Sequence, residues 1–384
     1  METSAVNERR RFVRAYARGT WTMAALCAQY GISAPCGYKW WARYLAEGDA
    51  GLVERSRAPH RCPHRTAAGL IAAIVAERRK YGWGAKKLLA VLSRRDPEQA
   101  WPALSTINTL LARRGLLERR RARPRWPRAA TVPLQSTRPN QIWPADFKGQ
   151  FKTGNGRYCY PLTITDHFSR RVLATHGLLA ISGAATRAVF LQVFRDVGLP
   201  DVIRTDNGGP FVSTGLHGLS ALSVWWMQLG ITHQRTRPAR PQDNGSHERM
   251  HRELKRETAR PPAATLRGQQ QRFDRFRQRY NAERPHEALA MATPDSRWTP
   301  SGRSYPSRLP APAYPGHWEV RRVCDAGTIK FQNVRIFLTQ ALHGHDVGLE
   351  EIDEDVWRVV YYQTPIGIVD SSTGEVTGIG RVSV

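Results

Sequence analysis

Three acidic residues stand at positions where a carboxylate can take part in chemistry. Asp146 lies in a stretch with strand character between large aromatic residues, where a charge is costly unless another charge compensates for it. Asp206 follows a short predicted strand, and strand ends in open α/β sheets often carry ligand groups. Glu248 lies in the first turns of a helix predicted at residues 244–259. Carboxylates from three separate elements can converge at one edge of a sheet, where their oxygens suit a hard divalent cation. These three residues are called the acidic triad below.

The predicted helix that carries Glu248 also carries basic residues on the same face. Arg252 and Lys255 follow Glu248 at i+4 and i+7, so one face would present an acid and then two bases. This order suits a metal site that continues into a track for phosphates. A solvated helix with i, i+4 ion pairs is the simpler alternative.

Other residues are alternatives to members of the acidic triad. Glu253 or Glu257 can replace the third member, since both follow it on the same predicted helix. Asp166 comes after the second predicted strand and before a turn, and it is the alternative to the first member. The Asp-Asn-Gly-Gly sequence that begins at Asp206 is also typical of a simple turn without a chemical role.

The charge of the chain favours a polyanionic partner. The 384 residues include 58 Lys or Arg and 32 Asp or Glu, a formal net charge of +26. Residues 1–139 hold 27 basic and 9 acidic residues, whereas residues 301–384 hold 8 and 10. The basic excess therefore lies in the first three quarters of the chain, for which double-stranded DNA is the predicted partner. A basic surface without a partner is the alternative.

Residues 1–55 are predicted to form a first helix-turn-helix module. Three short amphipathic helices are expected, with a turn at Gly31 and with Pro35 in the first turn of the third helix. Lys39 and Arg43 lie on that third helix, which in a helix-turn-helix enters the major groove. An ordinary three-helix core is the alternative.

Residues 56–118 are predicted to form a second module of the same kind. Helices are expected at residues 66–80, 86–93 and 106–114, with Ser105 as the cap of the last one. Two tandem modules would contact a longer DNA site than one.

Residues 119–138 form a basic linker. Like charges and two prolines at residues 119–128 prevent this stretch from folding alone, and they suit an arm that follows phosphates or a narrow minor groove. Arg121, Arg123 and Arg125 are its predicted DNA contacts.

The remaining sequence predicts a mixed α/β sheet covered by helices, then a small domain of strands. The catalytic core is placed at residues 139–262, with three strands at 143–151, 158–165 and 170–178 followed by alternating helices and strands. Beyond it we expect a helical extension at 263–300, a Pro- and Ser-rich linker at 301–316 and a small β-barrel at 317–384.

The cysteines and the hydropathy favour a cytoplasmic protein. The five cysteines are scattered and odd in number, which suits a reducing compartment. No apolar run is long enough for a membrane span.

Three motifs resemble those of insertion-sequence transposases with a retroviral-integrase-type core. They are Trp-Pro-Ala-Asp146-Phe-Lys-Gly, Thr-Asp206-Asn-Gly-Gly-Pro-Phe, and Arg-Pro-Gln-Asp-Asn-Gly-Ser-His-Glu248-Arg-Met-His-Arg-Glu-Leu-Lys. The segment Tyr280-Asn-Ala-Glu-Arg-Pro-His-Glu-Ala-Leu289 resembles the region after that core, and the two helical modules also fit.

The resemblance implies an RNase H-like fold and a metal-dependent reaction on DNA. It assigns two Mg²⁺ or Mn²⁺ ions to the acidic triad and implies an enzyme that cuts element ends and joins their 3′ ends to target DNA. Asn244, Arg252 and Lys255 become expected DNA contacts, and a homo-oligomer on DNA is expected. A DNA-binding regulator with an inactive core, or a nuclease without strand transfer, is the alternative.

Two features depart from the simplest analogy. The second and third acids lie 42 positions apart, and the extra length is expected in a helical insert at residues 213–230. The last 84 residues are slightly acidic, with acids clustered between residues 350 and 355. We therefore expect this region to serve mainly in subunit contacts, with a minor DNA role left open by Arg321 and Arg322. A solvated acidic loop without a partner is the alternative.

Overall fold

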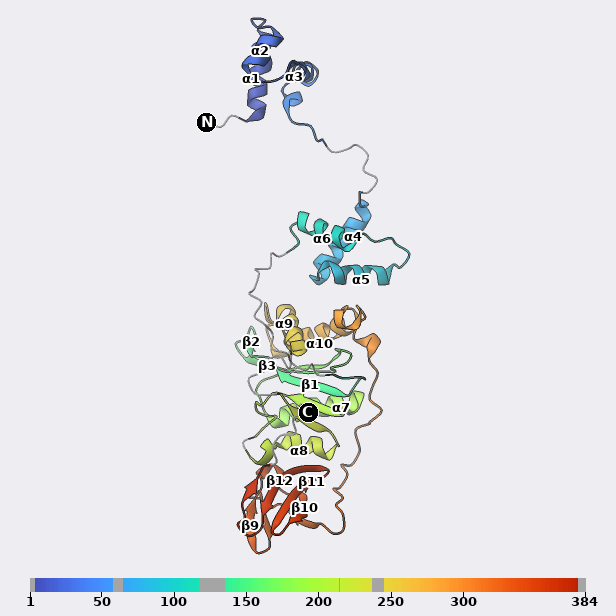
Figure 1. Cartoon of the computed structure of the whole chain (residues 1–384), viewed down its shortest axis with the longest axis vertical. Helices are drawn as coiled ribbons and strands as arrows, with labels where there is room; N and C mark the ends of the chain where they lie inside the picture. The colour runs from blue at the N-terminus through green and yellow to red at the C-terminus, as the bar shows by residue number, and fades with distance from the viewer. Residues whose placement is uncertain (1–3, 58–64, 118–134, 214, 237–244, 379–384) are drawn as a thin grey trace. The chain divides into compact units, whose positions relative to one another are not determined.

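A computed structural model describes residues 4–57, 65–117, 135–213, 215–236 and 245–378 (Figure 1). The chain divides into two compact units, Met1–Ala67 and Ala68–Val384, which are described separately. Among the described residues, no helix is long and apolar enough to cross a membrane.

The first unit contains the predicted three-helix module. Its helices are α1 (Ala5–Ala17), α2 (Met23–Gln29) and α3 (Ala34–Glu47), followed by the 3-10 turn η1 (Gly48–Leu52). Gly31 supplies the left-handed residue between α2 and α3, at φ +64°. The apolar stripes of the three helices meet in one core, formed by Phe12, Val13, Met23, Leu26, Cys27, Trp40 and Leu52.

The second unit begins with another group of three helices, α4 (Ala68–Tyr81), α5 (Ala85–Arg95) and α6 (Leu104–Arg113). The prediction that Ser105 caps the last helix was wrong. Ala103 is the residue at the N-cap, because its carbonyl accepts from Ile107 N at 3.0 Å and closes the first turn two residues earlier. These helices are called the second helical module below.

A six-stranded mixed sheet follows. Its strands are β1 (Ile142–Phe147), β2 (Phe151–Lys152), β3 (Tyr158–Thr165), β4 (Val172–Leu178), β5 (Val202–Thr205) and β6 (Thr232–Arg235). The order is β2-β3-β1-β5-β6, and β4 pairs with β3. The first four strands are joined by antiparallel pairings, and β5 and β6 then continue the sheet beside β1 in parallel, as expected for an RNase H-like core.

Helices cover both faces of this sheet. On one face lie α7 (Gly183–Val197) and α8 (Ala221–Gln228), whose aromatic side chains pack with Trp143 in the main core. On the other face lie α9 (Gly245–Thr258) and α10 (Leu266–Ala282), which pack on Cys159 and Val172 (Figure 1). The 3-10 turns of this region are η2 (Leu216–Gly218), η4 (Glu287–Leu289) and η5 (Asp295–Arg297).

The predicted linker at residues 301–316 has no regular element but is bound to the core. Arg303 donates to the carbonyl oxygens of Pro200 and Leu229, at 2.7 and 2.8 Å. Tyr305 and Leu309 pack against the main core.

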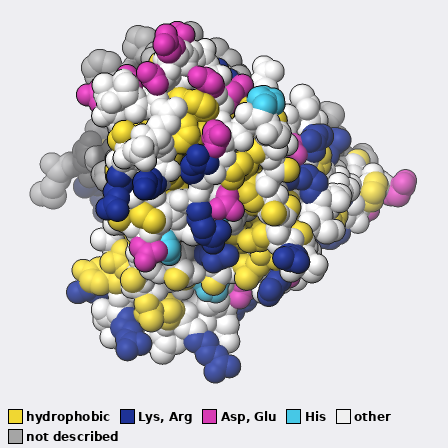
Figure 2. All heavy atoms as spheres, turned by 90° about the horizontal axis from the view of Figure 1, so that it is seen from below, with side chains coloured by type: hydrophobic (Ala, Val, Ile, Leu, Met, Phe, Trp, Pro, Cys, Tyr) yellow, Lys and Arg dark blue, Asp and Glu magenta, His cyan; other side chains and the backbone are white. Residues whose placement is uncertain are grey.

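The C-terminal region consists of antiparallel sheets. One sheet has the order β13-β12-β11-β10-β7 and a second pairs β8 with β9, and the described pairings do not close into the expected barrel. The two sheets share a core to which α8 contributes Val224 and Met227. On the face that Figure 2 draws, acidic, basic and apolar side chains are interspersed. The elements are β7 (Glu319–Arg322), β8 (Thr328–Phe331), β9 (Val334–Phe337), η6 (Gln340–Leu342), β10 (Asp346–Asp353), β11 (Val356–Tyr361), β12 (Thr364–Asp370) and β13 (Val376–Thr377).

Candidate active site

Strand pairing brings the first two acids to the same edge of the sheet. Asp146 is the fifth residue of β1 and pairs with Thr163 of the antiparallel β3. On its other side β1 pairs with β5 in parallel, and Asp206 directly follows β5. Because the carboxyl ends of parallel neighbours meet at one edge, the two aspartates lie on the same side of the sheet.

The loop after β5 holds Asp206 at the surface. The carboxylate accepts from the backbone N–H of Gly208 at 3.0 Å, and Asn207 Nδ2 donates to Thr236 O at 3.0 Å. The space beside the carboxylate is narrow, since a Cβ at Gly208 would lie 3.3 Å from both of its oxygens. The side chain is therefore oriented by its own loop while remaining exposed.

Helix α9 presents Glu248 from its first turn. Its apolar face is directed to the sheet by Met250 and Leu254, which are almost fully buried. Glu248, Arg252 and Lys255 are all exposed, as the i, i+4, i+7 spacing predicted. Asn244, just before the helix, lies outside the described residues.

Asp206 and Glu248 both lie close enough to Asp146 for their charges to act on its carboxyl. Burial raises the pKa of Asp146 to about 7, and the negative charges of Asp206 and Glu248 add to the rise. A carboxyl that is both desolvated and next to like charges is unfavourable as an anion. A divalent cation would remove this repulsion, so the donor set fits a metal such as Mg²⁺.

Two buried histidines on α9 join this site, and the sequence analysis did not select them. The rings of His247 and His251 pack edge to face, and their Nε2 atoms lie 2.7 and 2.6 Å from Thr163 Oγ1. Burial lowers the pKa of His247 to about 3 and that of His251 to about 2, so both rings are neutral at pH 7. His251 Nδ1 lies 3.7 Å from Asp146 Oδ2. Ligand atoms of Asp146, His247 and His251 lie within 4.8 Å of one another, so these residues form a group able to hold a metal ion. The i, i+4 spacing of His247 and His251 was the feature of the sequence that could have identified this pair.

The alternatives to the third acid are engaged elsewhere. Glu253 accepts from Arg256 at 2.7 Å and from Arg284 at 2.9 Å. Glu257 pairs with Arg256 and Arg279. Both carboxylates therefore have cationic partners within the fold, whereas Glu248 is the acid of α9 whose charge acts on Asp146.

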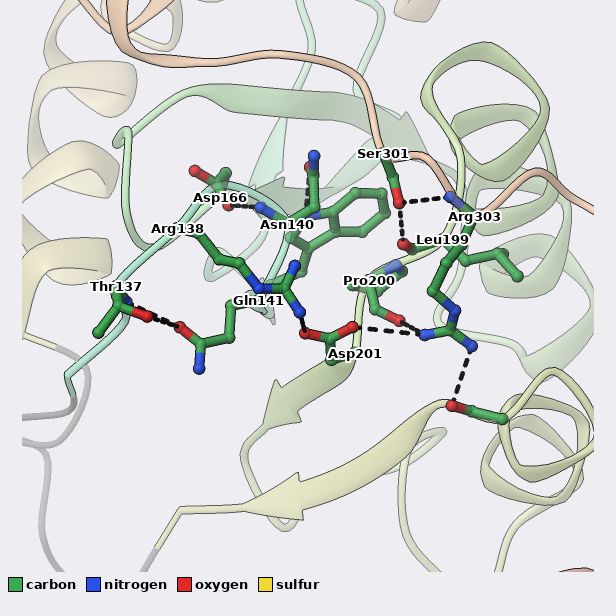
Figure 3. A network of polar contacts seen from close by, with 12 residues as sticks. Thr137, Arg138, Asn140, Gln141, Asp166, Leu199, Pro200, Asp201, Ser301 and Arg303 are labelled. Carbon is green, nitrogen blue, oxygen red and sulfur yellow. Dashed lines mark hydrogen bonds and ion pairs between the residues drawn. The ribbon is translucent and has the colours of Figure 1, made fainter.

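Asp166, the alternative to the first acid, has a structural environment. It is 1% exposed and accepts from the backbone N–H groups of Asn140 and Ser169, each at 2.8 Å. Figure 3 shows Asp166 in a network that reaches Asp201 and Arg303 on neighbouring segments. Its carboxylate oxygens accept hydrogen bonds from the segments before β1 and between β3 and β4, so they hold these connections in place.

The predicted DNA contacts of the first unit cluster around one indole. Lys39 Nζ and the Arg43 guanidinium lie 4.4 and 5.1 Å from the ring centre of the buried Trp40. Lys39 is exposed and Arg43 is half-buried. Arg121, Arg123 and Arg125 lie outside the described residues.

Models of known protein families match the two helical modules and the core that carries the acidic triad. A model described as an integrase core domain matches residues 136–241, and a second with the same description matches residues 229–294. A helix-turn-helix domain matches residues 8–60, and a homeodomain-like domain matches residues 36–111. The chain therefore carries an integrase core domain preceded by helix-turn-helix domains, which imply DNA binding.

Curated relatives come from insertion elements and retroviruses. An uncharacterised 31.7 kDa protein of insertion element IS407 from Burkholderia multivorans is 29% identical over 41% of this chain and 54% of that protein. An uncharacterised 39.2 kDa protein of insertion element IS476 from Xanthomonas euvesicatoria is 28% identical over 48% and 52%. A Pol polyprotein of radiation murine leukemia virus is 33% identical over 33% and 20%. The chain thus spans about half the length of the insertion-element relatives it matches.

Solved structures with some likeness include the HTLV-2 integrase catalytic core domain in complex with magnesium. Its TM-score is 0.33 at 20% identity, covering 42% of this chain and 99% of that one. The simian T-cell lymphotropic virus intasome in complex with PP2A regulatory subunit B56 gamma has a TM-score of 0.39 at 15% identity, covering 74% and 91%.

Proposed function

We propose that this chain is a DNA transposase that binds the ends of a mobile element, cleaves phosphodiester bonds there and transfers the freed 3′ ends into target DNA. The observation that supports the proposal is that Asp146 is buried and that the charges of both Asp206 and Glu248 act on it, with Asp146 and Asp206 at the carboxyl ends of neighbouring parallel strands. An integrase core domain in the same residues supports this assignment.

The acidic triad would hold two divalent ions, Mg²⁺ or Mn²⁺, which when bound would activate an attacking hydroxyl and stabilise the leaving oxygen. The chain's own part is to hold the ligands in place. The Gly208 N–H orients the carboxylate of Asp206. The Thr163 hydroxyl donates to the carbonyl oxygen of Asp146 at 3.1 Å and therefore accepts from the two imidazoles behind it.

The surrounding basic residues would position the DNA. Arg252 and Lys255 continue from Glu248 along the exposed face of α9, where they can contact phosphates of the strand that enters the site. Lys39 and Arg43 on α3 would contact the element end in the major groove. The arginines of the basic arm, together with Asn244, would add further contacts.

We also propose a homo-oligomer on double-stranded DNA within the bacterial nucleoid. The acids between residues 350 and 355 lie in the last part of β10 and in the turn that follows it, and those from 351 to 355 are exposed. This acidic surface would face a basic surface of a second copy.

The experiment is an end-cleavage assay with the purified full chain. The substrate is the DNA that flanks the gene on either side, labelled at each 3′ end, and Mg²⁺ or excess EDTA is added. We expect nicking at a defined position in Mg²⁺ and none in EDTA. Tight binding without nicking in either Mg²⁺ or Mn²⁺ would contradict the proposal and favour a DNA-binding regulator.

A further inference from the structure

Four basic residues from separate elements meet where the second helical module contacts the catalytic core. Burial lowers the pKa of His286 to about 3, and the positive charges of all four act on this ring in the same direction. The four, called the cation cluster below, are Lys87 of α5, Arg170 between β3 and β4, Arg249 of α9 and Arg284 after α10.

Contacts across the junction hold the cluster together. The Tyr81 hydroxyl donates to Glu283 at 2.5 Å, and Arg94 donates to the carbonyl oxygen of Met291 at 2.8 Å. The guanidinium of Arg284 lies 5.9 Å from the ring centre of Trp83, on the module, and 5.4 Å from that of Tyr280, on the core. The cluster is therefore built jointly by the second helical module and the core.

The cation cluster is short of anionic partners. Its acidic neighbours are Glu253, which Arg256 and Arg284 already share, and the more distant Glu287 and Asp166. The side chains of Lys87, Arg170 and Arg249 make no hydrogen bond or ion pair with any described residue. Burial lowers the pKa of Lys87 to about 8, and the charges of Arg284 and Arg249 contribute to this shift.

Buried polar atoms at this place also lack partners. Arg284 is 6% exposed, yet its Nε has no hydrogen bond within the described chain. The same holds for Nη1 of Arg170 and Nε2 of His286. Leaving buried donors of a charged group unpaired is costly, so the geometry is that of a site completed by an external anion.

We propose that the cation cluster binds one phosphate group of a DNA strand and so joins the second helical module to the core beside Glu248. A phosphate fits because its oxygens accept from several guanidinium and ammonium donors at once. Arg249 directly follows Glu248 and is exposed, so the cluster reaches the protein surface next to the third acid of the triad. This inference rests on the proposed function for the source of the phosphate.

A scan with single methylphosphonates tests the DNA assignment. Each phosphate near the cleaved bond of an element end is replaced in turn by the neutral group, and the affinity of the full chain is measured. For the unmodified protein we expect one position to weaken binding by about tenfold, the value typical of a charged hydrogen-bonded contact.

The variant Lys87→Gln should lose its sensitivity at that one position and keep it elsewhere. Lys86→Gln is the matched control, because it removes the same charge one residue away, where Lys86 pairs with Glu287 at 3.7 Å. Arg249→Gln should behave as Lys87→Gln does, and circular dichroism checks that each variant is folded. The proposal is overturned if the Lys86 and Lys87 variants give the same profile.

A second arm uses inorganic phosphate without DNA, against chloride at equal ionic strength. Phosphate should raise the Tm of the unmodified chain by about 2 °C or more and leave Lys87→Gln unchanged. If phosphate raises the Tm in this way but the unmodified chain neither binds nor cuts DNA, the phosphate site is supported and the proposed function is rejected. If the chain binds DNA and phosphate raises its Tm, but no methylphosphonate weakens binding, the assignment to DNA is overturned. If neither experiment shows an effect, the phosphate site is rejected.

Discussion

Asp146 has the most strongly altered environment of the acidic triad, because it combines burial with two acidic neighbours. Asp206 and Glu248 are exposed and have ordinary surroundings apart from this proximity. In the proposed site, Asp146 is therefore the inner carboxylate, with the imidazoles of His247 and His251 beside it, and Asp206 and Glu248 are the outer ones.

The variants Asp146→Asn, Asp206→Asn and Glu248→Gln should each abolish cleavage and joining while leaving DNA binding largely intact. A loss of more than about 100-fold is expected, since changes to the mere partners of metal ligands already cost 10–100-fold. Gel-based cleavage and binding assays on the same preparations measure both effects. Glu253→Gln is the control on α9. A reversal, with Glu253→Gln inactive and Glu248→Gln active, would show that the third ligand is assigned to the wrong residue.

A partly buried histidine on β6, outside the acidic triad, should make stability depend on pH. Burial lowers the pKa of His233 to about 3, and its Nε2 lies 2.9 Å from Thr205 Oγ1. The unfolded chain protonates this ring near pH 6.5 while the folded one does not, so stability falls as pH drops from about 6.5 toward 3. The slope is up to about 1.4 kcal/mol per pH unit.

Urea unfolding of the full chain at pH 7.5 and pH 5.5 measures this dependence. The variant His233→Gln should unfold with a shallower pH dependence than the unmodified chain. The exposed His317, changed to Gln, serves as the control and should leave the dependence unchanged. Equal slopes in all three proteins would contradict the assignment.

At the scale of elements, two adjacent residues of α9 are expected to have different roles, one in stability and the other in DNA binding. Leu254 is 1% exposed and packs on Phe273 and Phe276, whereas Lys255 is exposed. Leu254→Ala should lower the free energy of unfolding by about 2–5 kcal/mol. Lys255→Ala should leave stability unchanged and reduce the slope of log affinity against log salt by about 0.9.

Denaturant unfolding and salt-dependent binding distinguish the two variants. Arg267→Ala, in the first turn of α10, is a control that removes a charge away from the proposed DNA track. A salt slope that is equally reduced for Lys255→Ala and Arg267→Ala would show that α9 makes no specific phosphate contact.

Elements bounded by turn signals were predictable from the sequence. The strand predicted at 158–165 has the predicted limits, and the short strand predicted before Asp206 is present as β5. A single strand at 143–151 was wrong, since β1 ends at Phe147 and β2 begins at Phe151. Local pattern does not reveal such a break, because it depends on the partner strand: Lys148 N donates to the carbonyl oxygen of Pro161 at 2.8 Å.

The acidic triad was predictable because its members stand in local motifs, whereas its supports were not. The histidine pair depends on Thr163, which lies 84 residues before His247 in the sequence. The cation cluster likewise depends on how the second helical module packs on the core. Long-range contacts of this kind follow from tertiary structure and leave little trace in spacing. The domain limits drawn from the sequence remain predictions.

At the scale of the whole molecule, charge is distributed unevenly along the chain. The basic arm at residues 119–138 should contribute mainly nonspecific affinity for DNA. Replacing Arg121, Arg123 and Arg125 together by Ala should flatten the salt dependence, by about 0.9 for each phosphate that the arm no longer neutralises. Affinity should fall alike for element ends and unrelated duplexes.

Fluorescence anisotropy with both kinds of duplex at several salt concentrations measures the effect of the arm. A reduction in affinity confined to element ends would show that the arm reads sequence or shape instead. An unchanged salt slope would show that the arm does not bind DNA.

The central claim is that the chain joins DNA by metal-dependent strand transfer through the acidic triad, and a joining assay tests it most directly. Purified full chain is mixed with a precleaved element end and a supercoiled plasmid in Mg²⁺, and joined products are sequenced. The account predicts element 3′ ends joined to plasmid DNA with the unmodified chain, and no products with Glu248→Gln or in EDTA. Hydrolysis of the end without joining would identify a nuclease, and joining that persists in Glu248→Gln would contradict the proposed site.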